Sequence, residues 1–378
     1  MLTGQSVSIV SSTPGSTTDP VRKSMEISGI GPVVIIDTAG IDDVGDLGRQ
    51  RVEKTVEVVR QVDLAFVLIG NDILGQQEQF VVDLCRKTNT PCIPVCSKND
   101  TFTPDEQLVK TITSMFGVRP LSISTSDSSS TARIIAAILE HLPETAYRHD
   151  SLLGDIINRG DTVVLVCPID SSAPEGRLIL PQVQVLRDVL DNDASAVVCK
   201  DAQLQQQLSS MAVPPRLVVT DSQVFGNISS IVPASVPLTS FSVVLARAKG
   251  MFVEYLQGTK TIANLKDGDK VLLLESCTHN ITCEDIGRVK IPKLLSSFTG
   301  KKLSFDVVAG LGSLAAPITD YSLVIQCGGC VVSPKQLASR LLPAIEAGVP
   351  VSNYGLTLAY VNGIFDRAIQ IFQQKQAT

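Results

Sequence analysis

Three cysteines in the last third of the chain have the residue type and the spacing to bind a metal group. Cys277 stands in an S-C-T-H stretch, and Cys327 and Cys330 form a C-x-x-C pair in QCGGC (326–330). A C-x-x-C turn brings two thiolates together, and the two glycines between them let the backbone curl around a bulky inorganic core. Residue type and spacing therefore predict a thiolate-ligated site.

His279, two residues after Cys277, is a fourth candidate ligand. Its alternative role is that of a loop histidine hydrogen-bonded to backbone. Three cysteines and one histidine would suit a structural zinc ion, whereas three thiolates could hold three corners of a [4Fe–4S] cluster and leave the fourth iron open. The residues alone leave both metals equally open.

Short apolar runs precede both cysteine stretches directly. KVLLLES (270–276) leads into the first stretch, YSLVIQC (321–327) leads into the second, and LSFDVVAG (303–310) lies between them. Runs of this kind are typical of buried parallel strands. If the first and last runs are parallel neighbours, their cysteines lie together at the carboxyl ends of the sheet, where α/β folds place ligands.

The start of the chain contains motifs that resemble those of P-loop GTPases. DTAG (37–40) follows the apolar run 32–37 and resembles switch II, and PGSTTD (14–19) resembles the switch I of the TrmE and Era branch. In such proteins the Asp reaches magnesium through water and the Gly amide faces the γ-phosphate. The implied contacts are Thr17, or Thr18 in the alternative register, Asp37 and Gly40.

SKND (97–100) follows the run 91–96 and resembles the guanine-reading motif of the same proteins. Asp100 would accept two N–H bonds from guanine, Lys98 would pack on the base, and SIS (122–124) stands where a backbone-donating motif is expected. The phosphate-cradling G-x-x-x-x-G-K-[ST] is absent, and Ser97 replaces the usual Asn. We interpret the chain as truncated before switch I, so whether it hydrolyses GTP stays open.

The alternation of strand-like and helix-like stretches predicts an α/β fold with largely parallel sheets. Three α/β domains are expected: a P-loop GTPase-like domain over 1–148, a second domain over 155–237 and a third domain over 238–378. The boundaries follow a polar linker at 144–161 and a Pro-rich stretch at 231–240. No internal sequence repeat is apparent.

Composition excludes some classes of protein. Apolar residues make up 44% and charged residues 19% of the 378 residues, which is typical of a globular chain. The net charge of −6 and the lack of Trp argue against nucleic-acid binding, and no apolar run is long enough to span a membrane. Of the nine cysteines, five in apolar runs are expected to be small buried residues, namely Cys85, Cys92, Cys96, Cys167 and Cys199.

From about residue 162 to residue 365 the chain resembles the HydF family of [FeFe]-hydrogenase maturation GTPases. The resemblance depends on PIDSSAPEGRLILPQ (168–182), VVTDSQVF (218–225), CEDIGRVKIPK (283–293), LTSFSVVLARAKG (238–250) and GVPVSNYGLTLAYVNGIFDR (348–367). It also includes the C-x-H…C-x-x-C spacing, in which Gln326 stands where the family has His. The resemblance makes Cys277, Cys327 and Cys330, with His279, the ligands of a [4Fe–4S] cluster.

The resemblance implies a scaffold or carrier that delivers a di-iron precursor to apo [FeFe]-hydrogenase. It names the middle domain as a dimerisation domain and the third as the cluster-binding domain. The implied cofactors are the [4Fe–4S] cluster and GTP with Mg, with K⁺ as a further ion. The implied partners are apo-hydrogenase, radical-SAM maturases and a second copy of the chain; no nucleic acid and no membrane are expected.

Two alternatives come from other classes of protein. One is a TrmE-like regulatory GTPase that has a structural zinc domain, and the other is a structural metalloprotein that has lost GTPase activity. The sequence predicts a cytoplasmic protein, or one of a hydrogen-producing organelle if a presequence preceded Met1.

Overall fold

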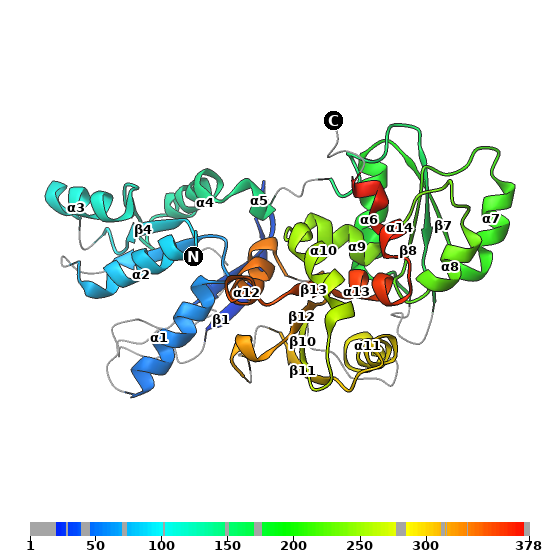
Figure 1. Ribbon diagram of the computed structural model, residues 1–378. Helices are drawn as coiled ribbons and strands as arrows, with labels where there is room; N and C mark the ends of the chain where they lie inside the picture. Colours follow the sequence, from blue (N-terminus) through cyan, green and yellow to red (C-terminus); the bar gives the residue numbers. More distant parts are fainter. Residues whose placement is uncertain are drawn as a thin grey trace. The chain divides into compact units, whose positions relative to one another are not determined.

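A computed structural model of the chain shows two compact units, Met1–His149 and Asp150–Thr378. The structure describes residues 20–27, 29–38, 46–69, 74–100, 103–147, 151–169, 176–276, 285–310, 314, 316–330 and 332–373. Both units contain helices and mainly parallel strands (Figure 1). The prediction of an α/β protein with largely parallel sheets is therefore confirmed.

The first unit contains β1 (Val21–Ile27), β2 (Gly31–Asp37), α1 (Asp46–Val59), β3 (Ala65–Ile69), α2 (Gln76–Lys87), β4 (Cys92–Cys96), α3 (Glu106–Phe116), β5 (Leu121–Ser122), α4 (Ser129–His141) and α5 (Glu144–Tyr147). The first half of the second unit contains β6 (Thr162–Val166), α6 (Leu180–Asp191), β7 (Ser195–Cys199), η1 (Asp201–Gln203), α7 (Leu204–Ser210), β8 (Leu217–Thr220), α8 (Phe225–Ile231), β9 (Leu238–Ser240) and α9 (Phe241–Ala248). The second half contains α10 (Phe252–Lys260), η2 (Thr261–Asn264), β10 (Lys270–Glu275), η3 (Ile286–Lys290), α11 (Ile291–Thr299), β11 (Ser304–Ala309), η4 (Ile318–Asp320), β12 (Leu323–Gln326), α12 (Pro334–Glu346), β13 (Val351–Asn353), α13 (Tyr354–Val361) and α14 (Phe365–Gln373).

A three-stranded parallel sheet in the order β3-β4-β5 forms the centre of the first unit. Apolar side chains of α2 pack on one part of this sheet, and those of α4 pack on another part. This arrangement places the residues after β4 and β5 at the same edge, as the parallel strands of an α/β layer require.

The strand predicted over 32–37 is present, but the expectation that it is a buried parallel strand is wrong. β2 pairs antiparallel with β1, and the two form a separate two-stranded sheet. The cause is a tight turn at which Gly29 and Gly31 have φ of +88° and +101°, values that glycine adopts without strain. β1 alternates between more and less exposed residues, as a strand with one face toward water does.

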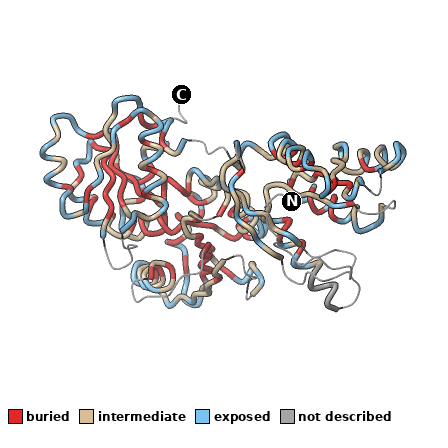
Figure 2. Tube along the Cα trace, turned by 180° about the vertical axis from the view of Figure 1, so that it is seen from behind, coloured by how far each residue is buried: buried red, intermediate tan, exposed pale blue. Residues whose placement is uncertain are grey.

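Two four-stranded parallel sheets form the second unit, in the orders β7-β6-β8-β9 and β11-β10-β12-β13. Their central strands are buried along their length, which Figure 2 shows as red segments. In β10, Val271 and Leu273 face the core beneath α11, whereas Leu272 and Leu274 face the core beneath α12. Both faces of this sheet are therefore covered by helices.

The two sheets repeat one another, which the sequence analysis missed. Both have the same strand order, and VPLTSFSVVLARAKGMF (236–252) aligns with VPVSNYGLTLAYVNGIF (349–365) at identical Val, Pro, Leu, Ala, Gly and Phe positions. The similarity escapes a sequence search because it is limited to one strand and the helix after it. The other strands share only an apolar character, which any buried strand has.

The helix that follows each half packs on the sheet of the other half. α10 contacts β13, and α14 contacts β9. The Thr259 hydroxyl lies 2.7 Å from that of Ser352, and Thr239 Oγ1 donates to the Ala368 carbonyl oxygen at 2.9 Å. This exchange joins the two halves into the single unit Asp150–Thr378. The predicted boundary at 237/238 inside this unit stays a prediction; β9, which begins at Leu238, pairs with β8.

Candidate functional site

The carboxyl ends of β10 and β12 lie side by side, as the sequence analysis expected of parallel neighbours. Leu274 of β10 is the register partner of Gln326 of β12. Cys327 follows β12 directly and, like Cys330, is partly buried. The other two predicted ligands, Cys277 and His279, lie outside the described residues.

The sulfur of Cys327 is surrounded by hydrogen-bonding groups. The Ser276 amide donates to Cys327 Sγ at 3.1 Å, and the Ser276 hydroxyl oxygen lies 3.1 Å from the same sulfur. Gln326 Nε2 lies 3.3 Å from it and donates to Ser276 Oγ at 2.9 Å. In the structure the sulfur thus accepts two hydrogen bonds, from the Ser276 amide and from Gln326 Nε2, and its own thiol donates to the Ser276 hydroxyl oxygen.

Gln326 is fully buried, and its Oε1 has no hydrogen-bond partner among the described residues. A neutral amide is a poor ligand for iron, so its position beside Cys327 suits a supporting role rather than that of a ligand.

Side chains from two further elements hold the strand ends in place. Arg340 of α12 donates to the carbonyl oxygens of Glu275 and Val308, each at 2.7 Å. Asn353 of β13 donates from Nδ2 to the carbonyl oxygens of Gln326 and Cys327, at 3.2 and 3.3 Å. These bonds fix the residues on which the position of the Cys327 sulfur depends.

Two cations are mostly buried near the cysteine turn. Burial lowers the pKa of Arg340 and that of Lys249, whereas the charges of Cys327 and Cys330, respectively, favour the protonated forms. Lys249 Nζ donates to the Val332 carbonyl oxygen at 2.7 Å. A cation that is removed from water is stabilised by nearby negative charge. The surroundings of the cysteine turn therefore suit an anionic group that is bound by thiolates.

The turn between the two cysteines depends on one of its glycines. Gly329 has a φ of +63°, and a Cβ there would lie 2.7 Å from Leu337 Cδ1. A Cβ on Gly328 would meet no atom of the described residues within 4 Å. Gly329 therefore shapes the turn, and the face of Gly328 is open to a bound group.

The residues present fit an iron–sulfur group. Two thiols, the hydrogen-bond donors to Cys327 and two half-buried cations are compatible with such a group. Among the described residues no group of three or more His, Cys, Asp or Glu side chains could hold a metal ion. Metal binding therefore stays a prediction that also depends on Cys277 and His279.

Four of the five cysteines expected to be small buried residues are buried, and Cys92 is partly buried. Burial raises the pKa of Cys167 to about 12, and it also raises the pKa of Cys96 and that of Cys199. A hydrogen bond with Cys85, together with burial, raises the pKa of Cys92. These thiols are protonated at neutral pH, as structural cysteines are.

In the first unit, Lys98 and Asp100 follow β4 and lie beside the loop after β5. The Asn99 amide donates to the Ile123 carbonyl oxygen at 3.1 Å, and the Ser124 hydroxyl donates to Asp100 Oδ1 at 2.8 Å. This hydrogen bond from Ser124 is the main reason that the pKa of Asp100 lies below its usual value. The Asp100 carboxylate is exposed and ionised, and it can accept hydrogen bonds from a base.

Of the remaining predicted nucleotide contacts, the structure describes Asp37 alone. Asp37 ends β2, whose only strand pairing among the described residues is with β1. Thr17 and Gly40 lie outside the described residues. Their roles toward magnesium and phosphate therefore stay predictions.

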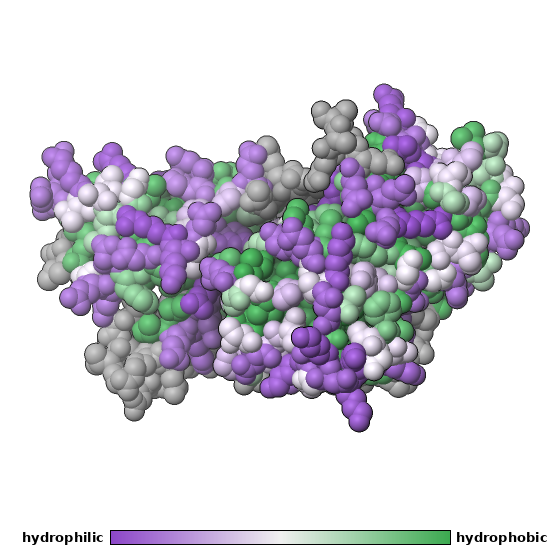
Figure 3. Space-filling model, viewed as in Figure 1, coloured by the Kyte–Doolittle hydropathy of each residue, from purple (hydrophilic) through white to green (hydrophobic). Residues whose placement is uncertain are grey.

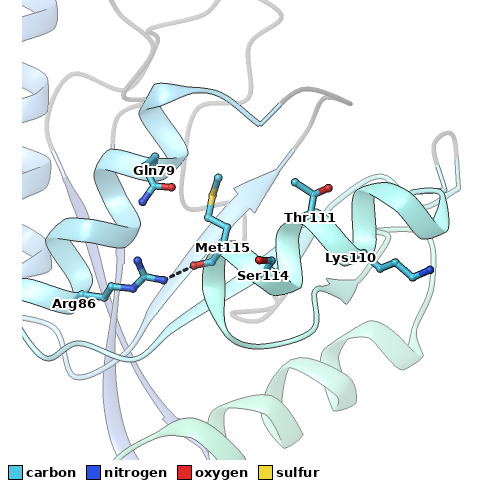
Figure 4. A pocket seen from close by; sticks show the side chains of 6 residues that line it. All are labelled: Gln79, Arg86, Lys110, Thr111, Ser114 and Met115. Atoms are coloured by element: carbon cyan, nitrogen blue, oxygen red, sulfur yellow. Dashed lines mark hydrogen bonds between the residues drawn. The ribbon is translucent and has the colours of Figure 1, made fainter.

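A shallow groove of about 570 Å³ lies between α2 and α3 of the first unit (Figure 4). Gln79, Arg86, Lys110, Thr111, Ser114 and Met115 line it. Arg86 donates to the Met115 carbonyl oxygen at 2.6 Å, which uses part of its hydrogen-bonding capacity. None of the predicted nucleotide contacts lines this groove.

The sequence analysis missed Ser276, Lys249 and Arg340. Ser276 directly precedes Cys277, which was the one available signal. Lys249 and Arg340 are distant in sequence from both cysteine stretches, and only the packing of α9 and α12 brings them near the turn.

Comparison with protein families covers nearly the whole chain. Residues 1–98 match the model described as "50S ribosome-binding GTPase". Residues 152–250 match "Hydrogen maturase F dimerization domain", and residues 253–371 match "Hydrogen maturase F tetramerization domain".

Individual relatives are similar to this chain over part of its length. The tRNA modification GTPase MnmE of Nitrosomonas europaea is 42% identical over 71 residues, which is 18% of this chain and 16% of that protein. The GTPase Era of Trichlorobacter lovleyi is 29% identical over 159 residues, which is 40% of this chain and 53% of that protein. The chain thus spans about half, or much less, of the length of these relatives.

A crystal structure of Era with MgGDPNP and a 16S ribosomal RNA fragment is 18% identical. It covers 53% of this chain and 87% of that chain at a TM-score of 0.34, a likeness from which we draw no conclusion.

The fold and the family matches together define the class of protein. It is an α/β protein whose first unit is of the GTPase type and whose second unit contains oligomerisation domains. The two hydrogen maturase F models jointly match more than half of the chain, which belongs to the hydrogen maturase F (HydF) family. The predicted family is confirmed. The predicted homodimer agrees with the match to a dimerization domain, and the match to a tetramerization domain indicates a further level of assembly.

No helix in the described part of the chain is long and apolar enough to cross a membrane.

Proposed function

We propose that this protein is an [FeFe]-hydrogenase maturation factor that binds a [4Fe–4S] cluster and delivers a di-iron precursor to apo-hydrogenase. Cys277, Cys327 and Cys330 hold the cluster, and His279 is a further, exchangeable ligand. The observation that supports this most is the meeting of the β10 and β12 carboxyl ends at Cys327, whose sulfur accepts hydrogen bonds from the Ser276 amide and from Gln326 Nε2. The bound cluster supplies a coordination position at which the precursor is tethered.

The protein's own residues prepare that position. Arg340 and Asn353 fix the backbone of the strand ends, so the thiolates are held without a large rearrangement on binding. Lys249 and Arg340 offset the negative charge of the thiolates. Gly328 leaves one side of the turn open to the bound group.

In this proposal the first unit binds GTP and recognises its guanine base. Asp100, held by Ser124 and ionised, accepts the two N–H groups of the base, and Lys98 packs on its face. Thr17, Asp37 and Gly40 contact magnesium and the γ-phosphate. We propose that GTP turnover times the exchange of partners, which are apo-hydrogenase and the radical-SAM maturases.

The experiment is a transfer assay. Protein isolated under anaerobic conditions from cells that contain the radical-SAM maturases is mixed with apo-hydrogenase, and hydrogen evolution is measured. Activation by the unmodified protein, and loss of activation by Cys327→Ala, are the expected results. Activation that is equal with Cys327→Ala would contradict the proposal, because the precursor would then be held elsewhere.

A further inference from the structure

Ser276 and Gln326 form a connected polar pair between two strand ends. Both are buried, with Gln326 at 0% and Ser276 at 8% exposure, so water does not compete for their hydrogen bonds. Gln326 Nε2 donates to Ser276 Oγ at 2.9 Å, which occupies the oxygen as an acceptor. In the structure the Cys327 thiol also donates to Ser276 Oγ, at 3.1 Å. A metal-bound thiolate carries no hydrogen, so the Ser276 hydroxyl is then free to donate to the sulfur instead.

The Ser276 amide adds a second donor that no side-chain substitution removes. It lies 3.1 Å from Cys327 Sγ, and Arg340 holds the preceding carbonyl group, that of Glu275. Gln326 Nε2 is a third donor at 3.3 Å. The sulfur thus accepts hydrogen bonds from a rigid backbone group and from the Gln326 side chain, and as a metal-bound thiolate it would also accept one from the Ser276 hydroxyl.

We infer that Ser276 and Gln326 are positioning residues that hold the Cys327 thiolate and set the reduction potential of the cluster bound there. This inference rests on the proposed function. Hydrogen bonds to a ligating sulfur withdraw electron density from it and stabilise the reduced cluster, which raises the reduction potential. Gln326 therefore acts through Cys327 and does not ligate iron itself.

Thr220 offers a matched control in the other sheet. It ends β8, which has the place of β12 in the repeated strand order, and it is fully buried like Gln326. Its hydroxyl has no partner among the described residues. Thr220→Val therefore removes a buried polar group at the equivalent strand end without touching a cysteine.

The test compares the unmodified protein with Gln326→Leu, Ser276→Ala, Ser276→Thr and Thr220→Val after anaerobic reconstitution with iron and sulfide. Iron per chain is measured first, and the midpoint potential is then determined by titration with dithionite followed by EPR. Gln326→Leu and Ser276→Ala should keep their iron and shift the potential to more negative values. Ser276→Thr, which keeps the hydroxyl, and Thr220→Val should retain the potential of the unmodified protein.

Equal potentials in all the loaded proteins would overturn this inference alone. Loss of iron from Gln326→Leu and Ser276→Ala would also overturn it, because the pair would then be needed for binding rather than for tuning. If the unmodified protein takes up no iron and sulfide, the proposed function fails, and this inference fails with it.

Discussion

At the scale of single residues, each candidate site has a serine that donates a hydrogen bond to the predicted functional group. The Ser124 hydroxyl donates to Asp100 in the first unit, and the Ser276 amide donates to Cys327 in the second. Ser276 directly follows β10, and Ser124 lies two residues after β5, so both stand near the carboxyl end of a parallel strand. A serine at such a position helps to orient the neighbouring side chain.

Substitution of Asp100 tests the base-reading role. Asp100→Asn keeps the shape of the side chain but offers guanine one acceptor instead of two, and the new amide donor opposes a guanine N–H group. Loss of a charge-assisted hydrogen bond costs about 1.5–3 kcal/mol, which corresponds to roughly 10- to 100-fold weaker binding. Titration with a fluorescent guanine nucleotide measures the effect.

Asp105→Asn is the matched control for this substitution. Asp105 caps α3 by accepting from the Leu108 amide at 2.7 Å, and asparagine caps helices equally well. Its nucleotide affinity should equal that of the unmodified protein. Equal affinity of Asp100→Asn and the unmodified protein would show that Asp100 does not read the base.

At the scale of elements, the sequence allowed the prediction of the buried strands β10, β11 and β12, because an apolar run between polar turns has few alternatives. It did not predict the short strands β9 and β13, of which β9 lies in the Pro-rich stretch that was interpreted as a boundary. The adjacency of β10 and β12, which precede the two cysteine stretches, agrees with the expectation that they are parallel neighbours. Two further features could not be predicted. The β1–β2 hairpin needed the conformation of two glycines, and the packing of α10 and α14 on the sheets of the opposite halves depends on contacts between residues far apart in sequence.

The packing of α10 on β13 can be tested at Gly258. A Cβ on this residue would lie 2.0 Å from the Val351 carbonyl oxygen, so helix and strand must separate to accept it. Gly258→Ala should lower the free energy of unfolding by about 1–3 kcal/mol, as overpacking does. Urea denaturation of the protein provides the measurement.

The control for this prediction is Gly226→Ala in α8. The nearest atom to a Cβ on Gly226 is Asn362 Oδ1 at 4.0 Å, and alanine favours a helix over glycine by about 1 kcal/mol. This variant should be as stable as the unmodified protein or more stable. If both variants gain stability, α10 does not lie against β13 in solution.

At the scale of the whole molecule, the matches to dimerization and tetramerization domains require surfaces for other copies of the chain. Figure 3 shows apolar side chains interspersed with hydrophilic ones on the surface of the second unit. One group of exposed apolar residues follows a single face of α6, at Leu180, Val183 and Leu190. Val198 of the edge strand β7 is also exposed, so we propose that α6 and β7 contact a second copy.

A charged residue introduced on this face of α6 tests the proposed contact. Leu190, whose exposed fraction is 55%, lies within the residues matched to the dimerization domain. Leu190→Asp should reduce the mass in solution because a buried unpaired carboxylate opposes association. Light scattering after size-exclusion chromatography determines the mass of each variant.

Val213→Asp is the control, since Val213 is 74% exposed in the loop after α7. It should leave the mass unchanged. If Leu190→Asp also has the mass of the unmodified protein, the copies associate through another face.

The central claim is that the thiols beside the β12 end bind an iron–sulfur cluster, and metal analysis tests it most directly. Protein reconstituted anaerobically should contain about four iron and four sulfide per chain, and Cys327→Ala and Cys330→Ala should lose most of both. Cys199→Ala, which removes a buried thiol at the end of β7, should keep them. Stoichiometric zinc without sulfide in the unmodified protein, or full iron and sulfide in Cys327→Ala, would contradict the claim.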